Sequence, residues 1–234
     1  MKLILERDRL LKYAKLFQHV SEEGLFTVSE QSLTLRTIDP AHVTLLTLDI
    51  KPVGKDEVYE CGKNMNNFGL RSDDLVQIIS KFPSGSLVSM TLTNKSLIKI
   101  KCSGSCYQLK TVEIVHIDLP TPSIKGGKGS IQVEQSEFLT LLEQALIIDF
   151  NAKFQIGKKG IVLSCRSDKG EYTSRPIGDV VKEGPVSGVY SLEYLIPLVK
   201  EMRDFSMKFS NKTPLYVISN DKAVQIYLAP RTET

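Results

Sequence analysis

The chain has 234 residues, of which 41% are apolar, and its formal net charge is +3. A chain of this length can bury a sizeable core, either as one large domain or as two ordinary ones. The small net charge argues against a protein that binds nucleic acid over its whole surface, but it permits a local basic face. The opening MKLILERDRL brings in charge too early for a signal peptide, and no apolar run approaches the roughly 20 residues that span a bilayer. We therefore expect no membrane association and a cytosolic or nuclear compartment.

Four cysteines are spread along the chain: Cys61, Cys102, Cys106 and Cys165. Cys102 and Cys106 are close together, but no second pair of cysteines and no nearby pair of histidines completes a zinc site. We expect buried, reduced thiols, although a hyperthermophilic source would leave room for a disulfide. The sequence indicates neither a metal nor a cofactor.

The first half of the chain alternates strand and helix patterns. A strand is predicted at residues 2–5, and a helix starts near Asp8 because apolar residues recur at i, i+4 and i+7 from Leu10. A second helix starts at Ser72-Asp73-Asp74, whose side-chain oxygens we expect to cap it. Alternation with a period of two predicts strands at residues 25–28, 33–37, 43–50, 59–62, 87–92, 97–102 and 107–115.

After a stretch rich in proline and glycine at residues 111–130, the same plan recurs. A short strand at residues 131–133 precedes a helix that we expect Ser136 to cap, and Ser191 opens a fourth helix. Pro197 suits that helix only within its first turn, because deeper in the helix it would cause a kink. Further strands are predicted at residues 152–156, 161–166, 171–177, 185–190, 206–209, 215–219 and 223–228.

The repeat offset of roughly 120 residues is far longer than a solenoid unit. It implies two similar α+β domains, each with two helices and about eight or nine strands. We place an N-terminal domain at residues 1–115, a connecting loop at 116–130 and a C-terminal domain at 131–234.

Three segments resemble parts of a known family. Residues 33–45 read LTLRTIDPAHVTL and are similar to a strand, a turn with a D-x-x-H-V element, and a second strand. Residues 191–195, SLEYL, resemble the start of the family's last helix, and residues 227–231, YLAPR, resemble its terminal Y-L-A-P-K/R. Because the three segments occur in the right order over the whole chain, the sequence resembles the sliding clamps of archaeal and eukaryotic replication, typified by proliferating cell nuclear antigen (PCNA), and in particular their archaeal type.

The resemblance implies the α+β DNA-clamp fold, with two similar domains, each having two helices packed on antiparallel sheets, that assemble into a ring of three subunits. Such a ring encircles duplex DNA without sequence specificity and acts as a processivity factor that tethers polymerase, ligase and nuclease during replication and repair. Subunits would pair edge to edge, with residues 107–115 of one beside residues 180–186 of the next, which would bury exposed sheet edges. A homotrimer and a heterotrimer of paralogues both remain open.

Several cations share helix faces; the first helix, for example, carries three at i, i+3 and i+7. A clamp must attract phosphates without reading bases, so a modest number of flexible cations suits it. The resemblance implies that these residues face DNA: Lys12, Lys15, His19, Lys81, Lys200 and Arg203. The alternative is ordinary solvated helix faces. The third helix carries Glu137 and Glu143 and no lysine, so either DNA tilts toward the first domain or partner subunits supply the charge.

The resemblance also implies a groove for short client peptides, in which a glutamine precedes an aliphatic residue and two aromatic residues. The glutamine would meet backbone carbonyls near Ala229, while the apolar side chains fill a cavity. The clients would be DNA polymerase, clamp loader, flap endonuclease and DNA ligase, each binding through a PCNA-interacting peptide. The matching positions are Ile38, His42, Val43, Leu45, Ile117, Leu119, Ile124, Pro214, Tyr227, Leu228, Ala229 and Pro230. For the connecting loop, buried loop hydrophobes are the alternative.

Other classes of protein fit less well. Residues 126–130, GGKGS, only look like a phosphate-binding loop, because they follow prolines rather than a strand. His19, His42 and His116 lack metal-ligand spacing, so we expect no catalytic residue and no enzyme. The remaining rivals are a clamp-like accessory or checkpoint subunit of a mixed ring and a non-encircling processivity factor, which should show a stronger basic face. The expected location is cytoplasmic and nucleoid-associated in an archaeon, or nuclear in a eukaryote.

Overall fold

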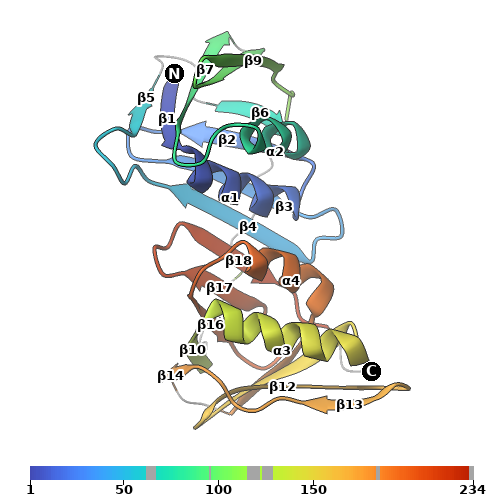
Figure 1. Cartoon of the computed structure of the whole chain (residues 1–234). Helices are drawn as coiled ribbons and strands as arrows, with labels where there is room; N and C mark the ends of the chain where they lie inside the picture. The colour runs from blue at the N-terminus through green and yellow to red at the C-terminus, as the bar shows by residue number, and fades with distance from the viewer. Residues whose placement is uncertain (62–66, 95, 115–121, 123–128, 183–184, 232–234) are drawn as a thin grey trace. The chain divides into compact units, whose positions relative to one another are not determined.

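The computed structural model describes residues 1–61, 67–94, 96–114, 122, 129–182 and 185–231, and Figure 1 colours them along the chain. The chain divides into two compact units. The first unit comprises Met1–Pro40 and Leu46–Leu119, and the second comprises Ala41–Leu45 and Pro120–Thr234. The short segment Ala41–Leu45 therefore belongs with the second unit although it lies early in the sequence.

The first half of the chain contains two helices and nine strands among its described residues. Its elements are β1 (Lys2–Glu6), α1 (Arg7–Gln18), β2 (Glu23–Val28), β3 (Leu33–Ile38), β4 (Thr44–Ile50), β5 (Val58–Glu60), β6 (Asn67–Arg71), α2 (Ser72–Ser80), β7 (Leu87–Asn94), β8 (Leu97–Cys102) and β9 (Ser105–Lys110). One sheet has the strand order β5-β1-β7-β8-β9, and β4, β3, β2 and β6 are neighbours in that order in a second sheet.

The second half repeats this succession. Its elements are β10 (Gly129–Val133), α3 (Gln135–Ile148), β11 (Asn151–Gly157), β12 (Gly160–Ser167), β13 (Gly170–Thr173), β14 (Asp179–Lys182), β15 (Val186–Ser191), α4 (Leu192–Lys200), β16 (Phe205–Phe209), β17 (Leu215–Ser219) and β18 (Val224–Leu228). Its sheets have the orders β14-β10-β16-β17-β18 and β13-β12-β11-β15, which match those of the first half position for position. The predicted duplicated α+β plan is confirmed.

Each unit has its own aromatic core between helices and sheets. In the first unit, the ring of Phe26 packs edge-on against Phe17 of α1 at 5.6 Å and is stacked on Phe68 of β6 at 5.4 Å. In the second unit, Phe138 of α3 contacts Phe154 and Phe205 at 5.9 and 5.7 Å. Burial of one such side chain contributes about 1.5–3 kcal/mol, so these contacts hold each helix pair on its sheets.

Two predicted helix caps are wrong. The N-cap of α2 is Arg71, because β6 runs straight into the helix, and Ser72 is buried with its hydroxyl donating to the Glu22 carbonyl at 3.3 Å. The N-cap of α3 is Glu134, and the Ser136 hydroxyl donates to the Glu134 carboxylate rather than closing the helix. Strand-to-helix junctions without a loop leave no room for the expected caps.

Ser191 is the N-cap of α4 as predicted, but its side chain makes no capping bond. Pro197 lies inside α4 beyond the first turn, so the Glu193 carbonyl loses the backbone donor that would normally reach it.

The apolar face predicted for the first helix is confirmed, because Leu10, Ala14 and Phe17 of α1 are buried.

The predicted strand at residues 107–115 is wrong in extent. Ser103 and Gly104 have φ values of 47° and 85° and form a tight turn, so β9 begins at Ser105 and ends at Lys110. The chain then leaves the sheet, and the Val112 amide donates to the Gly69 carbonyl of β6 at 3.0 Å.

The expected connecting loop at 116–130 overlaps β10, which already begins at Gly129. Strand β6 was not predicted at all, and β14 was expected only as part of an edge strand at residues 180–186 that the resemblance implied. The expectation of buried thiols holds only for Cys102, since Cys106 is exposed on β9 and the other two are half-buried; all four are free.

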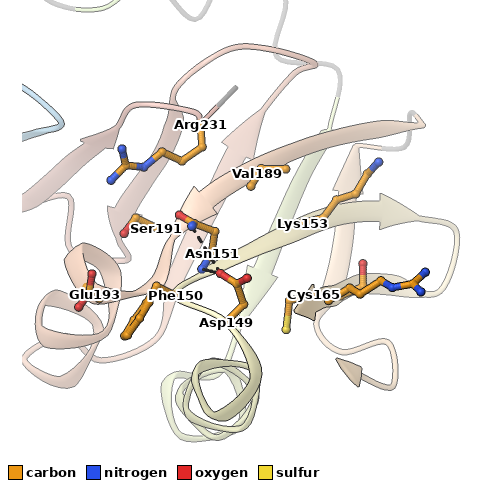
Figure 2. Close-up of a pocket in the computed structure, with 11 residues that line it drawn as sticks. Asp149, Phe150, Asn151, Lys153, Cys165, Val189, Ser191, Glu193 and Arg231 are labelled. Carbon is orange, nitrogen blue, oxygen red and sulfur yellow. Dashed lines mark hydrogen bonds between the residues drawn. The ribbon is translucent and has the colours of Figure 1, made fainter. Parts of the chain in front are cut away.

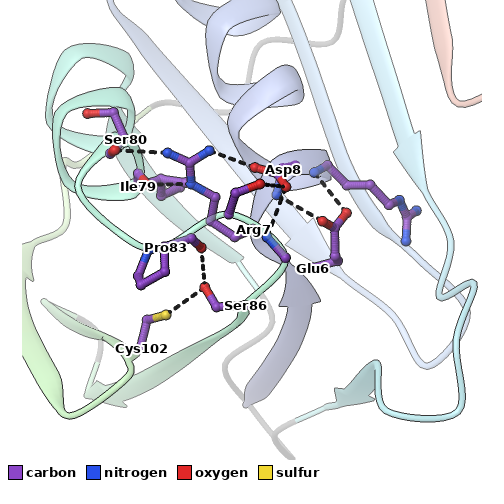
Figure 3. A network of polar contacts seen from close by, with 11 residues as sticks. Glu6, Arg7, Asp8, Ile79, Ser80, Pro83, Ser86 and Cys102 are labelled. Carbon is purple, nitrogen blue, oxygen red and sulfur yellow. Dashed lines mark hydrogen bonds and ion pairs between the residues drawn. The ribbon is translucent and has the colours of Figure 1, made fainter.

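A polar joint ties α1 to α2 (Figure 3). The guanidinium of Arg7, the first residue of α1, donates to the Ile79 carbonyl at 3.0 Å and to the Ser80 carbonyl at 2.8 Å, at the end of α2. At the other end of the pair, the Gln18 amide donates to the Asp73 carboxylate at 2.7 Å. The two helices are therefore fixed to each other at both ends.

The second unit uses the same device without a charge. Gln135, the first residue of α3, donates its side-chain amide to the Val199 carbonyl at 3.2 Å, in the last turn of α4. In both units, then, the residue that opens the first helix donates to a carbonyl in the last turn of the second helix.

Asp8 supports the joint in the first unit. Its carboxylate accepts from the Ser84 hydroxyl at 2.6 Å, from Arg7 at 2.6 Å and from the Gly85 amide at 3.0 Å. The hydrogen bond from Ser84, followed by that from Arg7, lowers the pKa of Asp8 from 3.8 to about 2. A carboxylate whose pKa is lower in the folded state stabilises the fold above pH 3.8, and that contribution disappears as the pH falls through about 2.

We therefore expect Asp8→Asn to reduce the urea midpoint at pH 7, and we expect the difference from the parent chain to shrink between pH 4 and pH 2. Urea denaturation across this range measures it. Asp168→Asn, which changes an exposed turn residue, is the matched control and should leave the midpoint unchanged. A difference that does not vary with pH would contradict the role of the Asp8 charge.

Candidate functional site

The cations of α1 lie on the side of the helix away from its buried stripe. Lys12 and Lys15 are half-buried, and His19 is exposed at the C-cap. The Lys12 ammonium lies 5.6 Å from the centre of the Tyr13 ring, a cation–π contact that holds the stem against the helix. The three predicted residues thus come from one face of one helix.

Lys81 lies just beyond α2, as its C-cap, rather than on the helix itself. It is exposed, and its charge is placed favourably at the negative end of the helix dipole. Because the joint described above fixes α1 against α2, Lys81 and the α1 cations belong to one rigid helix pair.

The corresponding helices of the second unit are less basic. Lys200 forms an ion pair with Glu143 of α3 at 3.0 Å, with both side chains about half exposed. Glu137 pairs with Arg175 at 2.5 Å. Arg203 is exposed but lies outside α4. The structure thus explains the acidic residues of α3: one of them offsets the single lysine of α4.

Two short segments of the second unit form the described part of the predicted groove. The Ala229 amide donates to the Val43 carbonyl at 2.8 Å, which aligns residues 41–45 with the end of β18. His42 has a φ of 57°, turns the chain and is exposed. Further along, the Arg231 amide donates to the Val189 carbonyl of β15 at 2.8 Å, so residues 229–231 are held on both sides.

Burial separates the predicted groove residues into two groups. Val43, Pro214, Ala229 and Pro230 are half-buried and can contact a ligand. Leu45, Tyr227 and Leu228 are buried, and they support the groove from below. Ile38 is half-buried in the first unit. Ile117, Leu119 and Ile124 of the connecting loop, and His116, lie outside the described residues.

Tyr216 belongs to this region although the sequence did not predict it there. Its ring lies 4.7 Å from that of Tyr227, its partner in the neighbouring strand, and its hydroxyl is 3.1 Å from the Gln225 side-chain oxygen, to which it donates. Burial and then the neighbouring Tyr227 raise the pKa of Tyr216 to about 12, so its hydroxyl remains a donor at neutral pH. Pairing the alternation of β17 with that of β18 would have placed the two tyrosines opposite each other.

The second unit also has a cavity of about 750 Å³ at the ends of β11 and β12 (Figure 2). Charges of both signs line it, among them Asp149, Lys153, Glu193 and Arg231. The thiol of Cys165 donates to the Ala145 carbonyl at 3.5 Å, and burial, together with the nearby Asp149 charge, raises its pKa. A thiol with a raised pKa is a poor nucleophile, so this cavity shows no catalytic arrangement around Cys165.

Within the described ranges, no group of three or more His, Cys, Asp or Glu is placed to hold a metal ion. None of the helices in the described part of the chain is long and apolar enough to cross a membrane.

Comparisons with known proteins agree with the duplicated fold. No family model matches the chain. The DNA polymerase sliding clamp of Cenarchaeum symbiosum is 28% identical over 234 residues, covering 91% of this chain and 90% of that protein. Among solved structures, A. fulgidus PCNA bound to the C-terminal region of FEN-1 matches with a TM-score of 0.86 at 18% identity, over 100% of this chain and 99% of that one. The PCNA2–PCNA3 complex of Sulfolobus tokodaii matches with a TM-score of 0.86 at 18% identity, over 100% of both chains.

The two α+β units with matching sheets define a protein of the clamp fold, and the full-length likeness to solved PCNA chains agrees. Together with the curated relatives, this supports a sliding clamp of the PCNA family.

The division between exposed and supporting groove residues can be tested by measuring the free energy of unfolding of variants. Leu228→Ala should lower the free energy of unfolding by about 2–5 kcal/mol, because it opens a cavity in a closed core. Pro230→Ala, at a half-buried position two residues away, should change it by less than about 1 kcal/mol. Urea denaturation of both variants measures the difference, and equal effects would show that Leu228 is not a core residue.

Proposed function

We propose that this chain is a DNA polymerase sliding clamp. It is one subunit of a ring of three subunits that encircles duplex DNA and tethers polymerase, nuclease and ligase during replication and repair. The observation that carries the proposal is the full-length likeness, at 28% identity, to a protein named DNA polymerase sliding clamp. The helix pairs and the groove then take the roles of DNA-facing and client-binding surfaces.

The DNA-facing residues are Lys12, Lys15, His19, Lys81, Lys200 and Arg203. Flexible ammonium groups attract phosphates without reading bases, so the ring can slide. Retention comes from topology, and the affinity can therefore stay low. Since Lys200 is paired with Glu143 at 3.0 Å, the first unit supplies most of the attraction.

The client-binding surface is the groove built from residues 42–45 and 227–230 with Pro214, and the family resemblance adds Ile38 and the connecting-loop residues Ile117, Leu119 and Ile124. It would take a peptide of DNA polymerase, clamp loader, flap endonuclease or DNA ligase. The solved structure of A. fulgidus PCNA with the C-terminal region of FEN-1 supports a nuclease tail as one such ligand. Main-chain pairing and apolar burial would supply the affinity.

Subunits would join through exposed sheet edges. Strand β9 is an edge strand with Cys106 and Tyr107 exposed, and in the second unit both β13 and β14 are edges of their described sheets. Pairing β9 of one subunit with such an edge of the next would satisfy its open hydrogen-bonding groups. The match to the PCNA2–PCNA3 complex keeps a ring of paralogues as an alternative to three identical copies.

The chain would act without catalysis and without a cofactor. The mixed charges and the raised pKa of the Cys165 thiol in the cavity at the ends of β11 and β12 support this. It would work beside DNA, at the nucleoid in an archaeon or in the nucleus of a eukaryote.

The DNA-facing assignment predicts the effect of Lys12→Ala/Lys15→Ala/Lys81→Ala. Loading onto primed DNA should weaken, and the slope of log affinity against log salt concentration should fall by about three, roughly one for each phosphate that the variant no longer neutralises. Loading assays between 50 and about 200 mM salt measure this slope.

The matched control is Lys158→Ala/Lys159→Ala/Lys169→Ala, which removes the same charge from exposed turns and should leave loading unchanged. Glu143→Gln should act in the opposite direction, because it releases Lys200 from its ion pair. Unchanged loading in the Lys12→Ala/Lys15→Ala/Lys81→Ala variant would contradict the DNA-facing assignment. An equal loss of loading in this variant and in the matched control would also contradict it.

The groove predicts that Val43→Ala weakens binding of a peptide that carries glutamine, one aliphatic and two aromatic residues in that order. Removing two methyl groups from an apolar contact costs about 1.6 kcal/mol, roughly a tenfold change in Kd. Calorimetric titration measures it. The control is Val53→Ala, at a valine of the first unit that is 78% exposed. Native peptide affinity in both variants would contradict the role of Val43 in the groove.

A further inference from the structure

The second unit has a hollow of about 480 Å³ on the sheet face formed by strands β14, β10, β16, β17 and β18, and three lysines surround it. Lys182 comes from β14, Lys208 from β16 and Lys222 from the turn before β18. The described residues that line it include no aspartate or glutamate. The hollow is separate from the client groove and from the helix faces.

The register of the sheet explains why the lysines gather. Ser130 of β10 lies opposite Lys182 on one side and opposite Lys208 on the other. Residues paired across strands point to the same face, and two strand spacings put the two lysine backbones about 10 Å apart. Their neighbours Ile131 and Met207 are fully buried, so the lysines stand on the face of the sheet away from the core.

Within the described part of the chain, no ion pair neutralises the charges around this hollow. The ion pairs formed among the described residues involve none of the three lysines. Three ammonium groups around one hollow repel one another, and an anion placed between them would relieve that repulsion.

The first unit shows that the fold does not require this arrangement. At the corresponding row of its sheet, Lys2 of β1 lies opposite Glu60 on one side and Thr91 on the other. There an acidic residue faces the single lysine, whereas the second unit has a lysine on both sides of a serine. The excess of positive charge is therefore particular to the second unit.

Two apolar side chains complete the hollow. Val181, next to Lys182, is 68% exposed where β14 bulges against β10, and Ile218 of β17 is half-buried. An exposed aliphatic side chain beside uncompensated lysines suits a ligand that carries both carboxylates and an apolar group.

We propose that this hollow docks an acidic, extended segment of a partner protein, with its carboxylates on Lys182, Lys208 and Lys222 and one aliphatic side chain against Val181 and Ile218. A protein segment fits better than nucleic acid, because the lining has no aromatic side chain on which a base could stack. The proposal does not depend on DNA, since the hollow lies on the face of the sheet opposite the helices.

Fluorescence anisotropy on the full chain tests the proposal, with a labelled peptide of acidic residues around one leucine, EEDLEED, and its neutral analogue QQNLQQN. The acidic peptide should bind and the neutral one should not. Lys182→Gln/Lys208→Gln should raise the Kd of the acidic peptide at least tenfold. Lys158→Gln/Lys159→Gln makes the same change in charge on the exposed turn between β11 and β12 and should leave the Kd within about twofold.

Thermal melting of each variant shows that it is folded. Three results would overturn the proposal: equal loss of binding in the control variant, equal binding of the neutral peptide, or no binding of the acidic peptide by the parent chain. Tighter binding of a single-stranded oligonucleotide that disappears in Lys182→Gln/Lys208→Gln would also overturn it, and would assign the hollow to nucleic acid.

Discussion

The fixed pairing of two helices in each unit is the constraint on which the rest of the structure depends. Arg7 in the first unit and Gln135 in the second donate to the carbonyls at the end of the neighbouring helix. Phe17 and Phe138 then anchor each pair in the core beneath. Cations on helices held in this way keep a constant spacing, which a surface that must attract DNA without gripping it requires.

The same joint is built from different chemistry in the two units, and the charge of the helix faces differs with it. The first unit closes the joint with a guanidinium that a carboxylate supports, and its helix face keeps lysines. The second unit closes it with a neutral amide, and its one helical lysine, Lys200, is paired with Glu143 at 3.0 Å. A duplicated fold thus presents one basic and one nearly balanced helix pair, and three further lysines of the second unit surround a hollow on a sheet face.

Much of this architecture could be predicted from the sequence, because alternation and helical spacing are local signals. The strands at Leu97–Cys102 and Leu215–Ser219 have the bounds that alternation indicated. Strand β6 was missed because its glycine interrupts the pattern and its place depends on Phe68 stacking on Phe26. The caps at Ser72 and Ser136 failed because strands lead directly into helices there.

The site was less accessible to sequence reasoning. The family resemblance supplied the groove positions, but it could not separate Leu228, which is buried, from Pro230, which is half-exposed. The ion pair between Lys200 and Glu143 joins residues that are distant in sequence. Such a contact arises from the tertiary fold and leaves no local pattern.

Encirclement of DNA is the central claim, and retention on closed and open DNA tests it most directly. The complete ring, placed by its clamp loader on a nicked circular duplex, is washed at high salt before and after one cut linearises the circle. The account predicts that the ring stays on the circle and is lost from the linear DNA, because topology rather than charge holds it. Equal loss from both forms would contradict the account.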